Sequence, residues 1–550
     1  MPIKTENQRC TGCGYCVAEC PSLAIQLEIE AVAWPRIDEK KCIRCGDCLY
    51  ICPNNVFSDP TLQAAPAALQ ETYDVIIIGA GIGGLMTAAG LTKAGKKVLI
   101  LDQLSFVGGK YTHLLHRGYA ISTAAWTCPG VKSRIGMLCR RLGAEINWIT
   151  IHDVKSRGEH WVVTKDGRRF ASLDEAQATL VGGDPGMARV YQWIADMYDP
   201  GKSYPPEMTT REYVETYFPG NDEYMRYVET IITHCFASQT VDNFPAIETK
   251  RAIVDSIEQM KDWGTAIGGT AAIVAGVEQV VRRHGGEISL RTQVEKIILE
   301  KGKAVGVRLV DGRVIKAGIV IHNAGLNRLV RLVGEENLPA DYLARLRSAV
   351  PANVAALIVG AQKDLLGKEH SLLHSMGWER TLNCYAPTFF DPGLAPQGMH
   401  MLDVFWVMKP PYDRRKELDL VLAQLRDIFP DYDQVVDLQF PMFFTGAWTA
   451  EMAHRKGQSG AERLDPKSPI ENLFLVGYDC IGYGMAGDII PHGVERVLYL
   501  ILGDPVYAPR DEKTGTRLEK WLKSRLFLLM ALGKKMKRGT AETQRTQRRF

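Results

Sequence analysis

Eight cysteines in the first 52 residues repeat one spacing twice, and each run ends in Cys-Pro. The first run contains Cys10, Cys13, Cys16 and Cys20, and the second contains Cys42, Cys45, Cys48 and Cys52. Three closely spaced thiolates can wrap one face of a cubane iron–sulfur cluster, and in two-cluster arrangements the fourth cysteine of each run ligates the other cluster. The spacing therefore predicts two [4Fe–4S] clusters. One is assigned to Cys10, Cys13, Cys16 and Cys52, and the other to Cys42, Cys45, Cys48 and Cys20.

Zinc binding and disulfide bonds are the alternatives for these cysteines. Zinc sites use cysteine pairs that lie apart in the chain, whereas here four cysteines fall within eleven residues before a proline. Disulfides are disfavoured in the cytosol, where we expect this chain. Residues 1–57 resemble the bacterial two-cluster ferredoxins, and the resemblance implies a small α+β ferredoxin domain.

A glycine-rich turn is the second candidate for chemistry. The apolar run Val75–Ile78 is typical of a buried parallel strand, and it leads into Gly79, Gly81, Gly83 and Gly84. In a G-x-G-x-x-G turn the first glycine allows a tight turn, the second lets the backbone approach a pyrophosphate, and the third lets helix pack on strand. A second strand ends at Asp102, where a ribose-binding carboxylate belongs. The pattern predicts a dinucleotide site and leaves NAD and FAD both open.

Gly108-Gly109-Lys110 resembles a segment that encloses FAD in the phytoene desaturase and amine oxidase superfamily, closest to its phytoene desaturase and carotenoid isomerase-like branch. The resemblance spans residues 73–502, and it implies FAD as the cofactor. It also implies FAD contacts from Val294, Gly477, Asp479, Gly484, Met485 and Gly487. The chain departs from the family at Asp102, where Glu is usual, and at Tyr478 and His492 in the last motif.

No motif identifies a catalytic acid or base. His492 is a weak candidate because it lies one turn from the last flavin motif. The side chains of His113, His116, His234 and Cys235 could also donate protons, although a lone histidine is more often structural. The single cysteines are Cys128, Cys139, Cys384 and Cys480, and for these we expect buried thiols.

The elements that position these residues predict an α/β chain. We expect a ferredoxin domain fused to a Rossmann-type FAD-binding domain with an inserted α+β substrate domain. The predicted boundaries are 1–57 for the ferredoxin, 58–72 for a linker, 73–150, 268–330 and 470–505 for the FAD-binding domain, 151–267 and 331–469 for the substrate domain, and 506–550 for a basic amphipathic tail.

Eleven aromatic residues lie between Pro185 and Pro245. They are explained either by a helical subdomain that packs through aromatic rings or by an aromatic-lined cavity for a long or planar apolar substrate. In the tail, Trp and Leu at helical spacing lie beside many Lys and Arg residues. This predicts contact with a membrane surface, with a helix docked on its own domain as the alternative.

The whole-chain totals fit a soluble globular protein. The apolar fraction is 46%, the charged fraction is 23%, and the net charge of +3 offers no argument for nucleic acid as a partner. No apolar run is long enough to span a bilayer, and the N-terminal segment does not resemble a signal peptide. We expect a cytoplasmic protein whose tail contacts the inner face of the membrane.

Together these features predict an FAD-dependent oxidoreductase that exchanges electrons between two [4Fe–4S] clusters and a carbon–carbon bond of an apolar, isoprenoid-type substrate. Low-potential clusters favour reduction over desaturation, and a soluble protein is expected as electron donor or acceptor. One alternative is an electron-transfer subunit that relays electrons to a partner protein. A second alternative is an isomerase that depends on reduced flavin.

Overall fold

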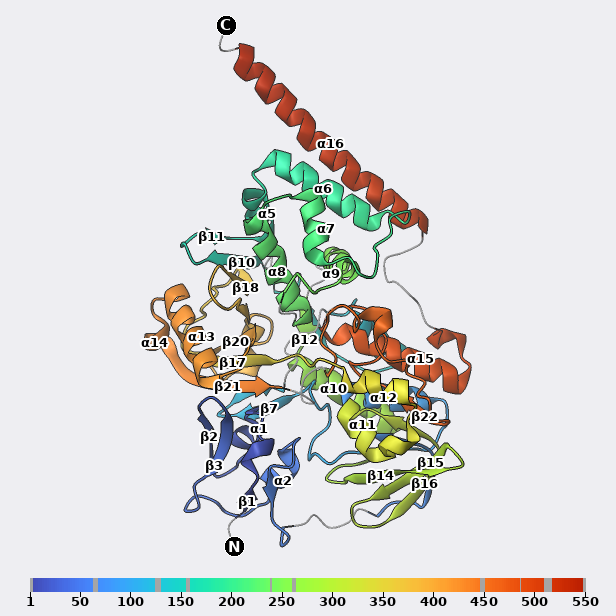
Figure 1. The fold of residues 1–550 in the computed structure, drawn as a ribbon. Coiled ribbons are helices and arrows are strands. Elements are labelled where there is room, and N and C mark those ends of the chain that lie inside the picture. Colours follow the sequence, from blue (N-terminus) through green and yellow to red (C-terminus); the bar gives the residue numbers. More distant parts are fainter. Residues whose placement is uncertain are drawn as a thin grey trace.

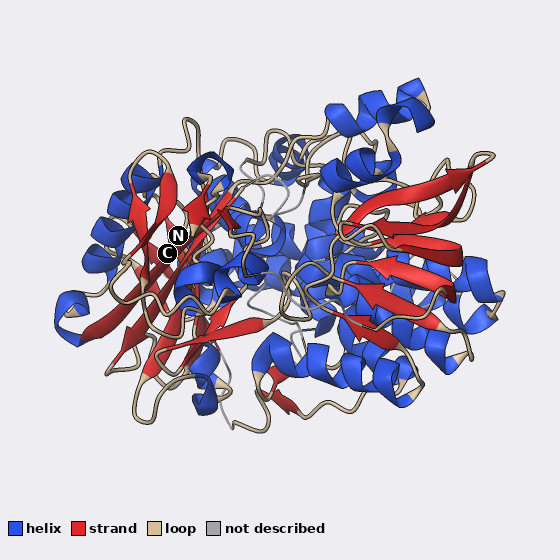
Figure 2. Ribbon diagram, turned by 90° about the horizontal axis from the view of Figure 1, so that it is seen from below, coloured by secondary structure: helices blue, strands red, loops and turns tan. Residues whose placement is uncertain are grey.

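The structure is a computed structural model that describes residues 3–62, 68–123, 130–154, 159–237, 240–259, 264–445, 451–484, 486–508 and 517–547. Two seven-stranded sheets lie on opposite sides of the molecule, with helices between them (Figure 2). A helical subdomain covers one end of this pair, and the N-terminal ferredoxin-like region lies at the other end (Figure 1). The mixed α/β architecture confirms the predicted fold class.

The first sheet has the order β13-β6-β5-β16-β15-β14, with β22 paired to β16. Its parallel part consists of β5 (Thr72–Ile78), β6 (Val98–Leu101), β13 (Glu287–Ser289), β16 (Val314–His322) and β22 (Leu473–Leu475). β14 (Val294–Glu300) and β15 (Lys303–Leu309) extend it as antiparallel strands. The predicted strands at 75–78 and 98–101 are therefore neighbours, as a dinucleotide fold requires.

Helices cover both faces of this sheet. One face packs against α3 (Ile82–Lys93), α4 (Arg134–Leu142), α10 (Gly269–Arg283) and α15 (Ile490–Leu502). The other face packs against α11 (Leu326–Val333) and α12 (Ala340–Arg347). Strands buried on both faces need apolar residues at successive positions, which explains why Val75–Ile78 and Val98–Leu101 do not alternate with polar residues.

The second sheet has the order β11-β10-β18-β19-β20-β17-β21. Its strands are β10 (Glu159–Thr164), β11 (Arg169–Phe170), β17 (Val354–Ala361), β18 (His370–Met376), β19 (Asn383–Tyr385), β20 (His400–Val407) and β21 (Val436–Phe444). One face packs on α13 (Arg414–Ile428), next to the short helix α14 (Tyr432–Val435). The opposite face packs on the hairpin of β7 (His113–His116) and β8 (Tyr119–Ser122), and on the ferredoxin-like region.

The aromatic-rich segment forms its own helical core. It folds into α5 (Leu173–Leu180), α6 (Asp184–Tyr198), α7 (Thr210–Tyr217), α8 (Asp222–Phe236) and α9 (Ala246–Gln259). The Trp193 ring contacts the rings of Tyr213, Phe218 and Tyr224, at centroid distances of 5.7, 5.8 and 6.3 Å. Of these aromatics, Phe236 lines the large cavity described below. The structure thus favours packing as the main role of this segment.

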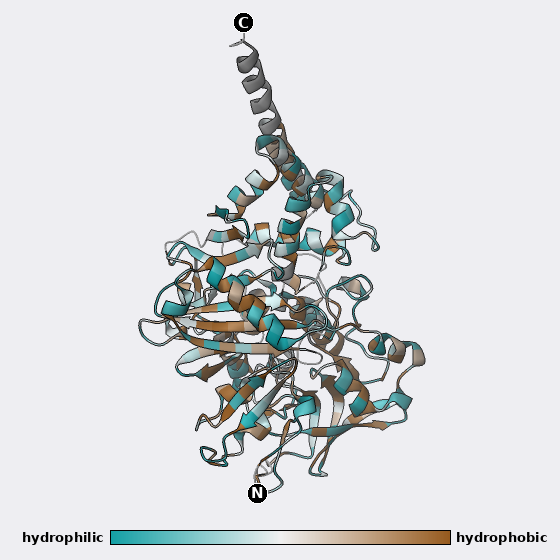
Figure 3. Ribbon diagram, turned by 60° about the vertical axis from the view of Figure 1, so that its left-hand side comes forward, coloured by the Kyte–Doolittle hydropathy of each residue, from teal (hydrophilic) through white to brown (hydrophobic). Residues whose placement is uncertain are grey.

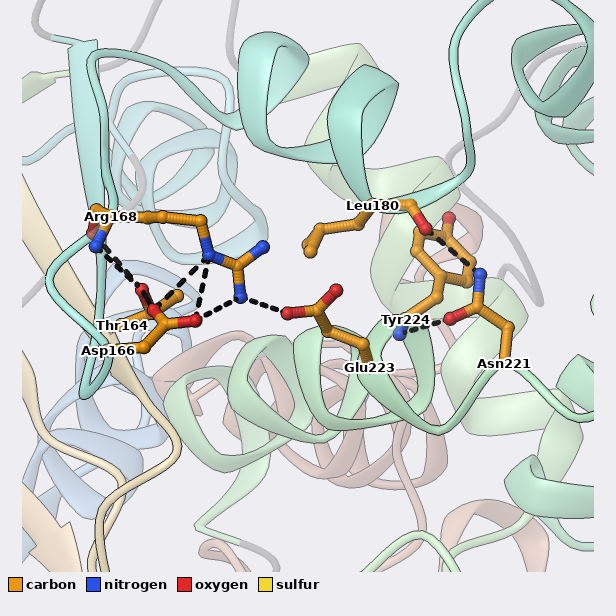
Figure 4. Close-up of polar contacts among 7 residues, drawn as sticks. All are labelled: Thr164, Asp166, Arg168, Leu180, Asn221, Glu223 and Tyr224. Atoms are coloured by element: carbon orange, nitrogen blue, oxygen red, sulfur yellow. Dashed lines mark hydrogen bonds and ion pairs between the residues drawn. The ribbon is translucent and has the colours of Figure 1, made fainter.

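The turn between β10 and β11 ties the second sheet to α8 (Figure 4). Arg168 Nε donates to Asp166 at 3.0 Å, and the same guanidinium pairs with Glu223 on α8. Asn221 caps the start of α8 by accepting from the Tyr224 N–H at 2.9 Å, and its side-chain amide donates to the Leu180 carbonyl at 2.9 Å. These contacts orient α8, whose far end carries Phe236 to the cavity.

The ferredoxin-like region is built as two matching halves. Its elements are β1 (Lys4–Thr5), α1 (Tyr15–Ala18), β2 (Ile25–Ile29), β3 (Ala33–Ile37), α2 (Asp47–Ile51) and β4 (Phe57–Ser58). Gly14 and Gly46 precede α1 and α2 with φ of 77° and 81°, a left-handed conformation that favours glycine. Ser58 pairs with Lys4, so the sheet extends one residue past the predicted end at 57.

Helix α16 (Arg517–Gln547) packs along α6 (Figures 1 and 3). The Phe527 ring stacks on Tyr198 at 5.6 Å, and Lys523 pairs with Glu258 at 2.7 Å. The opposite face of α16 exposes large apolar side chains: Leu518, Trp521, Leu522, Leu526, Leu529, Met530 and Leu532. Across the described ranges, every helix is too short or too polar to cross a bilayer.

Candidate active site

A cavity of about 320 Å³ opens at the carboxyl ends of the parallel strands of the first sheet. The last residues of four strands line it: Ile78, Leu101, His322 and Leu475. Open α/β sheets bind ligands at this edge because the strand-to-helix loops converge there. The cavity continues to the second sheet, where Ala352, Val354 and Phe405 form an apolar wall.

The glycine turn forms one wall of the cavity through close backbone contacts. Gly79 has φ of 105° and donates its N–H to the Leu101 carbonyl at 2.8 Å. The Gly108 N–H donates to Ala80 at 2.8 Å, so the two glycine segments lie side by side. The N-terminus of α3 follows Gly81 and has no side-chain cap, which leaves its N–H groups available for an anion.

Asn323 fills the space that the glycines leave open. A Cβ at Gly81 would lie 2.8 Å from Asn323 Nδ2, and a Cβ at Gly84 would lie 2.3 Å from the Gly79 carbonyl oxygen. Asn323 also donates to that carbonyl at 3.2 Å. Asn323 was not predicted as a site residue from the sequence. Its position after a predicted strand and before small residues is the one feature of the sequence that could have indicated it.

Asp102 lies in the cavity wall but is already engaged by backbone. Its carboxylate accepts from the Ala80 N–H at 2.7 Å and from the Leu104 N–H at 2.8 Å. Burial raises the pKa of Asp102, and these two N–H groups oppose the rise. Each carboxylate oxygen has a second lone pair, so Asp102 holds the glycine turn and can still accept from a ribose hydroxyl.

Most of the residues predicted to contact FAD meet in this cavity. Those that line it are Gly79, Gly81, Gly83, Asp102, Gly108, Gly109, Lys110, Val294, Gly477, Asp479 and Gly487. Gly84 lies behind the turn, where it packs helix against strand as the motif predicts. Gly484 packs instead against Asp488, with a Cβ position 3.2 Å from the Asp488 Cβ. Met485 lies outside the described residues.

Charged groups surround the end of the cavity near Lys110. Burial lowers the pKa of Lys110, and the carboxylates of Asp479 and Glu451 oppose this. Asp479 accepts from the Met452 N–H at 2.9 Å, and Glu451 accepts from the Asn327 N–H at the start of α11 at 2.9 Å. The role of Glu451 was not predicted, since it stands in no motif. Lys110 therefore shares this end of the cavity with two acids and with Arg328, whose charge adds to the lowering of its pKa.

The candidate histidines occupy different surroundings. His492 Nε2 lies 2.9 Å from the Tyr483 carbonyl, a contact that suits a structural role. His113 is buried beside Gly269, and burial lowers its pKa to about 4. His116 packs on Phe440 at 5.1 Å. His322, which we did not predict, lines the cavity with a pKa lowered to about 4 by burial.

Some predicted reactive groups cannot be placed. The side chains of His234 and Cys235, and all of Cys128, lie outside the described residues. Cys139, Cys384 and Cys480 are buried free thiols, as predicted. Burial raises the pKa of Cys480, which also lines the cavity.

The eight N-terminal cysteines gather in two pockets, each with three cysteines of one run and one of the other. The inner pocket contains Cys10, Cys13, Cys16 and Cys52. The outer pocket contains Cys42, Cys45, Cys48 and Cys20. All eight are free thiols, and the grouping matches the predicted exchange of the fourth ligand.

The donor set of each pocket, four cysteine sulfurs, fits a bound metal cluster. Burial and neighbouring cysteines raise the pKa of Cys16 well above its ordinary value and that of Cys48 to about 12. Such thiols ionise only with a cation beside them. Backbone N–H groups of Ala24 and Val56 point at Cys20 and Cys52 sulfurs, at 3.2 and 3.4 Å.

The inner pocket adjoins the dinucleotide cavity. Asn54 lines both of them, and the carbonyl of the preceding Pro53 accepts from Gln103 Nε2 at 3.0 Å and from the Arg328 guanidinium. The pocket also rests on the second sheet, where Phe443 N–H donates to Gly12 at 3.0 Å. Among the described residues, the outer pocket and the cavity have no lining residue in common, and Cys45 of the outer pocket is exposed.

Comparison with known proteins agrees with this geometry. Residues 82–489 match the family model described as flavin containing amine oxidoreductase, and residues 2–63 match a 4Fe-4S dicluster domain. Prolycopene isomerase from Daucus carota is 25% identical over 67% of this chain and 68% of its own length. A neurosporene-forming phytoene desaturase from Cereibacter sphaeroides is 27% identical over 45% and 52%.

Solved structures show the same fold. An oxidoreductase from Methanosarcina mazei superposes with a TM-score of 0.68 at 22% identity, covering 77% of this chain and 99% of that one. A redesigned putrescine oxidase superposes with a TM-score of 0.60 at 16% identity, covering 78% and 99%. Since the family model covers most of the chain, the protein belongs to the flavin-containing amine oxidoreductase family and is an FAD-dependent oxidoreductase with an N-terminal 4Fe-4S dicluster domain.

Proposed function

We propose that this enzyme exchanges electrons between two [4Fe–4S] clusters and a carbon–carbon bond of an apolar, isoprenoid-type substrate. The observation that carries the proposal is the shared wall between the inner cysteine pocket and the dinucleotide cavity, formed by Asn54. A chain that binds a one-electron carrier directly beside a flavin has no need of a separate protein for that transfer. Clusters of low potential favour reduction of the substrate.

We assign the FAD to the cavity and the clusters to the two cysteine pockets. The uncapped start of α3 and the Gly79–Gly84 turn would hold the pyrophosphate, and Asp102 the ribose. Bound FAD supplies hydride transfer, and the iron–sulfur clusters supply single electrons. Lys110 places a partly buried cation at one end of the cavity, and the acids Asp479 and Glu451 favour its charged form.

An apolar substrate is supported by the far wall of the cavity. Phe236, Ala352, Val354 and Phe405 come from α8 and the second sheet and meet there. Such a wall excludes water from a reaction that water would intercept. A subunit that only relayed electrons to a partner protein would have no use for this wall. The relatives named phytoene desaturase and prolycopene isomerase support an isoprenoid class.

An anaerobic experiment tests the proposal. The protein is reduced with dithionite, polyprenyl or carotenoid substrates are added, and flavin absorbance is followed. Reoxidation by one class, with one reduced product formed per two electrons, is the expected result. No reoxidation by any apolar substrate, combined with rapid electron transfer to an added carrier protein, would instead establish the relay function.

Isomerisation by reduced flavin is the second candidate function. It is favoured by the relatives named prolycopene isomerase, which match two thirds of this chain. In that case product forms from prolycopene-type substrates while the flavin stays reduced. Measuring product against reductant consumed separates the two functions, because reduction is stoichiometric and isomerisation is not.

We also propose that α16 contacts the inner face of an anionic membrane. Leu518, Leu526 and Leu529 are 65%, 56% and 66% exposed on its free face, and the exposed Arg525 lies among them. This combination is typical of helices that lie in the membrane interface. Co-sedimentation with anionic vesicles, lost in a Leu526→Ser/Leu529→Ser variant and in neutral vesicles, is the expected result. Equal binding of the variant would contradict it.

A further inference from the structure

A half-buried guanidinium, that of Arg328, occupies the junction between the inner cysteine pocket and the dinucleotide cavity. Arg328 lies on α11 and lines the cavity. Its Nη2 donates to the carbonyl of Pro53, the residue directly after Cys52. Gln103, which follows Asp102 in the cavity wall, donates to the same carbonyl at 3.0 Å. Two side chains of the FAD-binding fold therefore donate hydrogen bonds to one carbonyl of the ferredoxin-like region.

The charges around Arg328 belong to both sites. Burial lowers the pKa of Arg328, and the acidic groups of Asp102, Glu451 and Cys52 oppose this, whereas Arg331 adds to it. A buried cation is stable in a protein only when opposite charges compensate its lost hydration. Asp102 supplies such a charge from the ribose end of the cavity, and Cys52, the residue before Pro53, lines the inner pocket.

We propose that Arg328 is a positioning residue that couples the two cofactor sites: it clamps the Cys52–Pro53 corner against the ribose end of the flavin cavity, and its charge favours the reduced state of the group bound by Cys52. Reduction of an iron–sulfur cluster adds negative charge, so a nearby buried cation raises the reduction potential. The inference rests on the proposed assignment of a cluster to the inner pocket.

The outer pocket offers a matched control. Arg291 pairs with Asp47, which starts the helix beside Cys48, at 3.2 Å. The side chains of this pair are 42% and 38% exposed. Water and salt screen such a pair, so its charge should have little effect on a neighbouring cluster. Arg291 and Arg328 thus compare an exposed arginine with a half-buried one, and one of them lies near each set of cysteines.

The test uses the full-length holoprotein in the variants Arg328→Gln, Arg328→Lys and Arg291→Gln. Cluster potentials are measured by redox titration followed by electron paramagnetic resonance, and FAD release by flavin fluorescence. Arg328→Gln keeps a donor for Pro53 but loses the charge, so one cluster should shift to a more negative potential while the other stays unchanged. FAD should be released roughly tenfold faster, because the charge-assisted hydrogen bond to the Pro53 carbonyl, which holds the ribose end of the cavity, is weakened.

Arg328→Lys keeps the charge, so its cluster potential should stay near that of the wild type. A potential in Arg328→Gln equal to the wild type, or shifted no more than in Arg291→Gln, would overturn the inference.

If Arg328→Gln assembles no clusters, the variant Gln103→Leu tests whether the contacts with the Pro53 carbonyl hold the cavity together. Faster FAD release at unchanged cluster potentials supports the clamp, and unchanged FAD release refutes it. These readouts do not depend on turnover. A wild-type protein without iron would refute the cluster assignment as well, whereas normal clusters without an Arg328 effect would refute only this inference.

Discussion

The two cysteine pockets have the same ligand spacing but different surroundings. Each combines three cysteines of one run with the fourth of the other, behind a left-handed glycine and a short helix. The inner pocket is enclosed by the second sheet and the flavin cavity, whereas the outer pocket exposes Cys45. One local motif therefore yields one buried and one accessible site, and only contacts made by distant residues distinguish them.

Under the proposed function, this difference predicts the route by which electrons pass between the protein surface and the cavity. The outer pocket is the accessible end, and exposed Leu23 and Ile43, at 56% and 66%, flank its cysteines. The inner pocket is the end that reaches the flavin cavity, through Asn54. Substitutions at equivalent positions of the two pockets should therefore have unequal effects.

Cysteine substitutions should have the largest effect. Cys13→Ser and Cys45→Ser should each lose about half of the bound iron, because each removes a ligand of one cluster. Only Cys13→Ser removes the group beside the flavin cavity, so it should slow flavin reduction by dithionite more than Cys45→Ser does. Iron analysis and stopped-flow flavin bleaching measure both effects. Equal slowing in the two variants, with FAD bound in each, would contradict the assignment of an inner and an outer pocket.

Glycine substitutions come second. Gly14→Ala and Gly46→Ala both place a side chain at positive φ, at a cost of about 1–2 kcal/mol each. A Cβ at Gly14 would also lie 2.8 Å from the Phe440 ring of the second sheet, whereas at Gly46 the nearest atom is Leu62 Cβ at 3.4 Å. We expect a further loss of about 1–3 kcal/mol for Gly14→Ala from this overpacking.

The urea midpoint for loss of iron–sulfur absorbance measures the glycine effect. Gly46→Ala is the matched control, since it shares the backbone strain without the ring contact. If the two midpoints fall equally, the second sheet contributes nothing to the stability of the inner pocket.

The smallest difference is expected at Tyr15 and Asp47, the equivalent first residues of α1 and α2. The Tyr15 hydroxyl is buried and donates to the Thr123 carbonyl, so Tyr15→Phe should cost about 1 kcal/mol. Asp47→Asn should cost less than about 1 kcal/mol, because the Asp47–Arg291 pair is partly exposed.

Salt separates these two effects. At about 1 M salt the screening length falls to roughly 3 Å, so the effect of Asp47→Asn should vanish while that of Tyr15→Phe persists. Urea midpoints of both variants at low and high salt give the comparison. A salt-sensitive Tyr15→Phe effect would show that the inner contact is not enclosed.

Sequence reasoning recovered much of the fold because its strongest patterns are local. The apolar runs before Gly79 and Asp102 predicted adjacent strands, and β5 and β6 are parallel neighbours. The aromatic segment could not be assigned in the same way. Its rings suit both a cavity and a core, and their mutual packing around Trp193 appears only once five helices are assembled.

The candidate site was predicted in part for the same reason. Glycine motifs can be recognised from their spacing in the sequence, and most of the predicted glycines line the cavity. Asn323, Arg328 and Glu451 could not be found this way. They are ordinary polar residues in the sequence, and they matter because burial places their charges and amides against the glycine turn and the cysteine corner.

The sequence alone determined the chemistry of this protein: thiolate spacing for iron–sulfur clusters, and a glycine turn with an acid for a dinucleotide. Those features are local because ligand geometry and backbone conformation depend on neighbouring residues. Only the tertiary structure decided which cysteine pocket meets the cavity, and which arginine lies between them. Contacts of this kind join residues hundreds of positions apart, such as Pro53 and Arg328, and depend on how the sheets and the ferredoxin-like region pack.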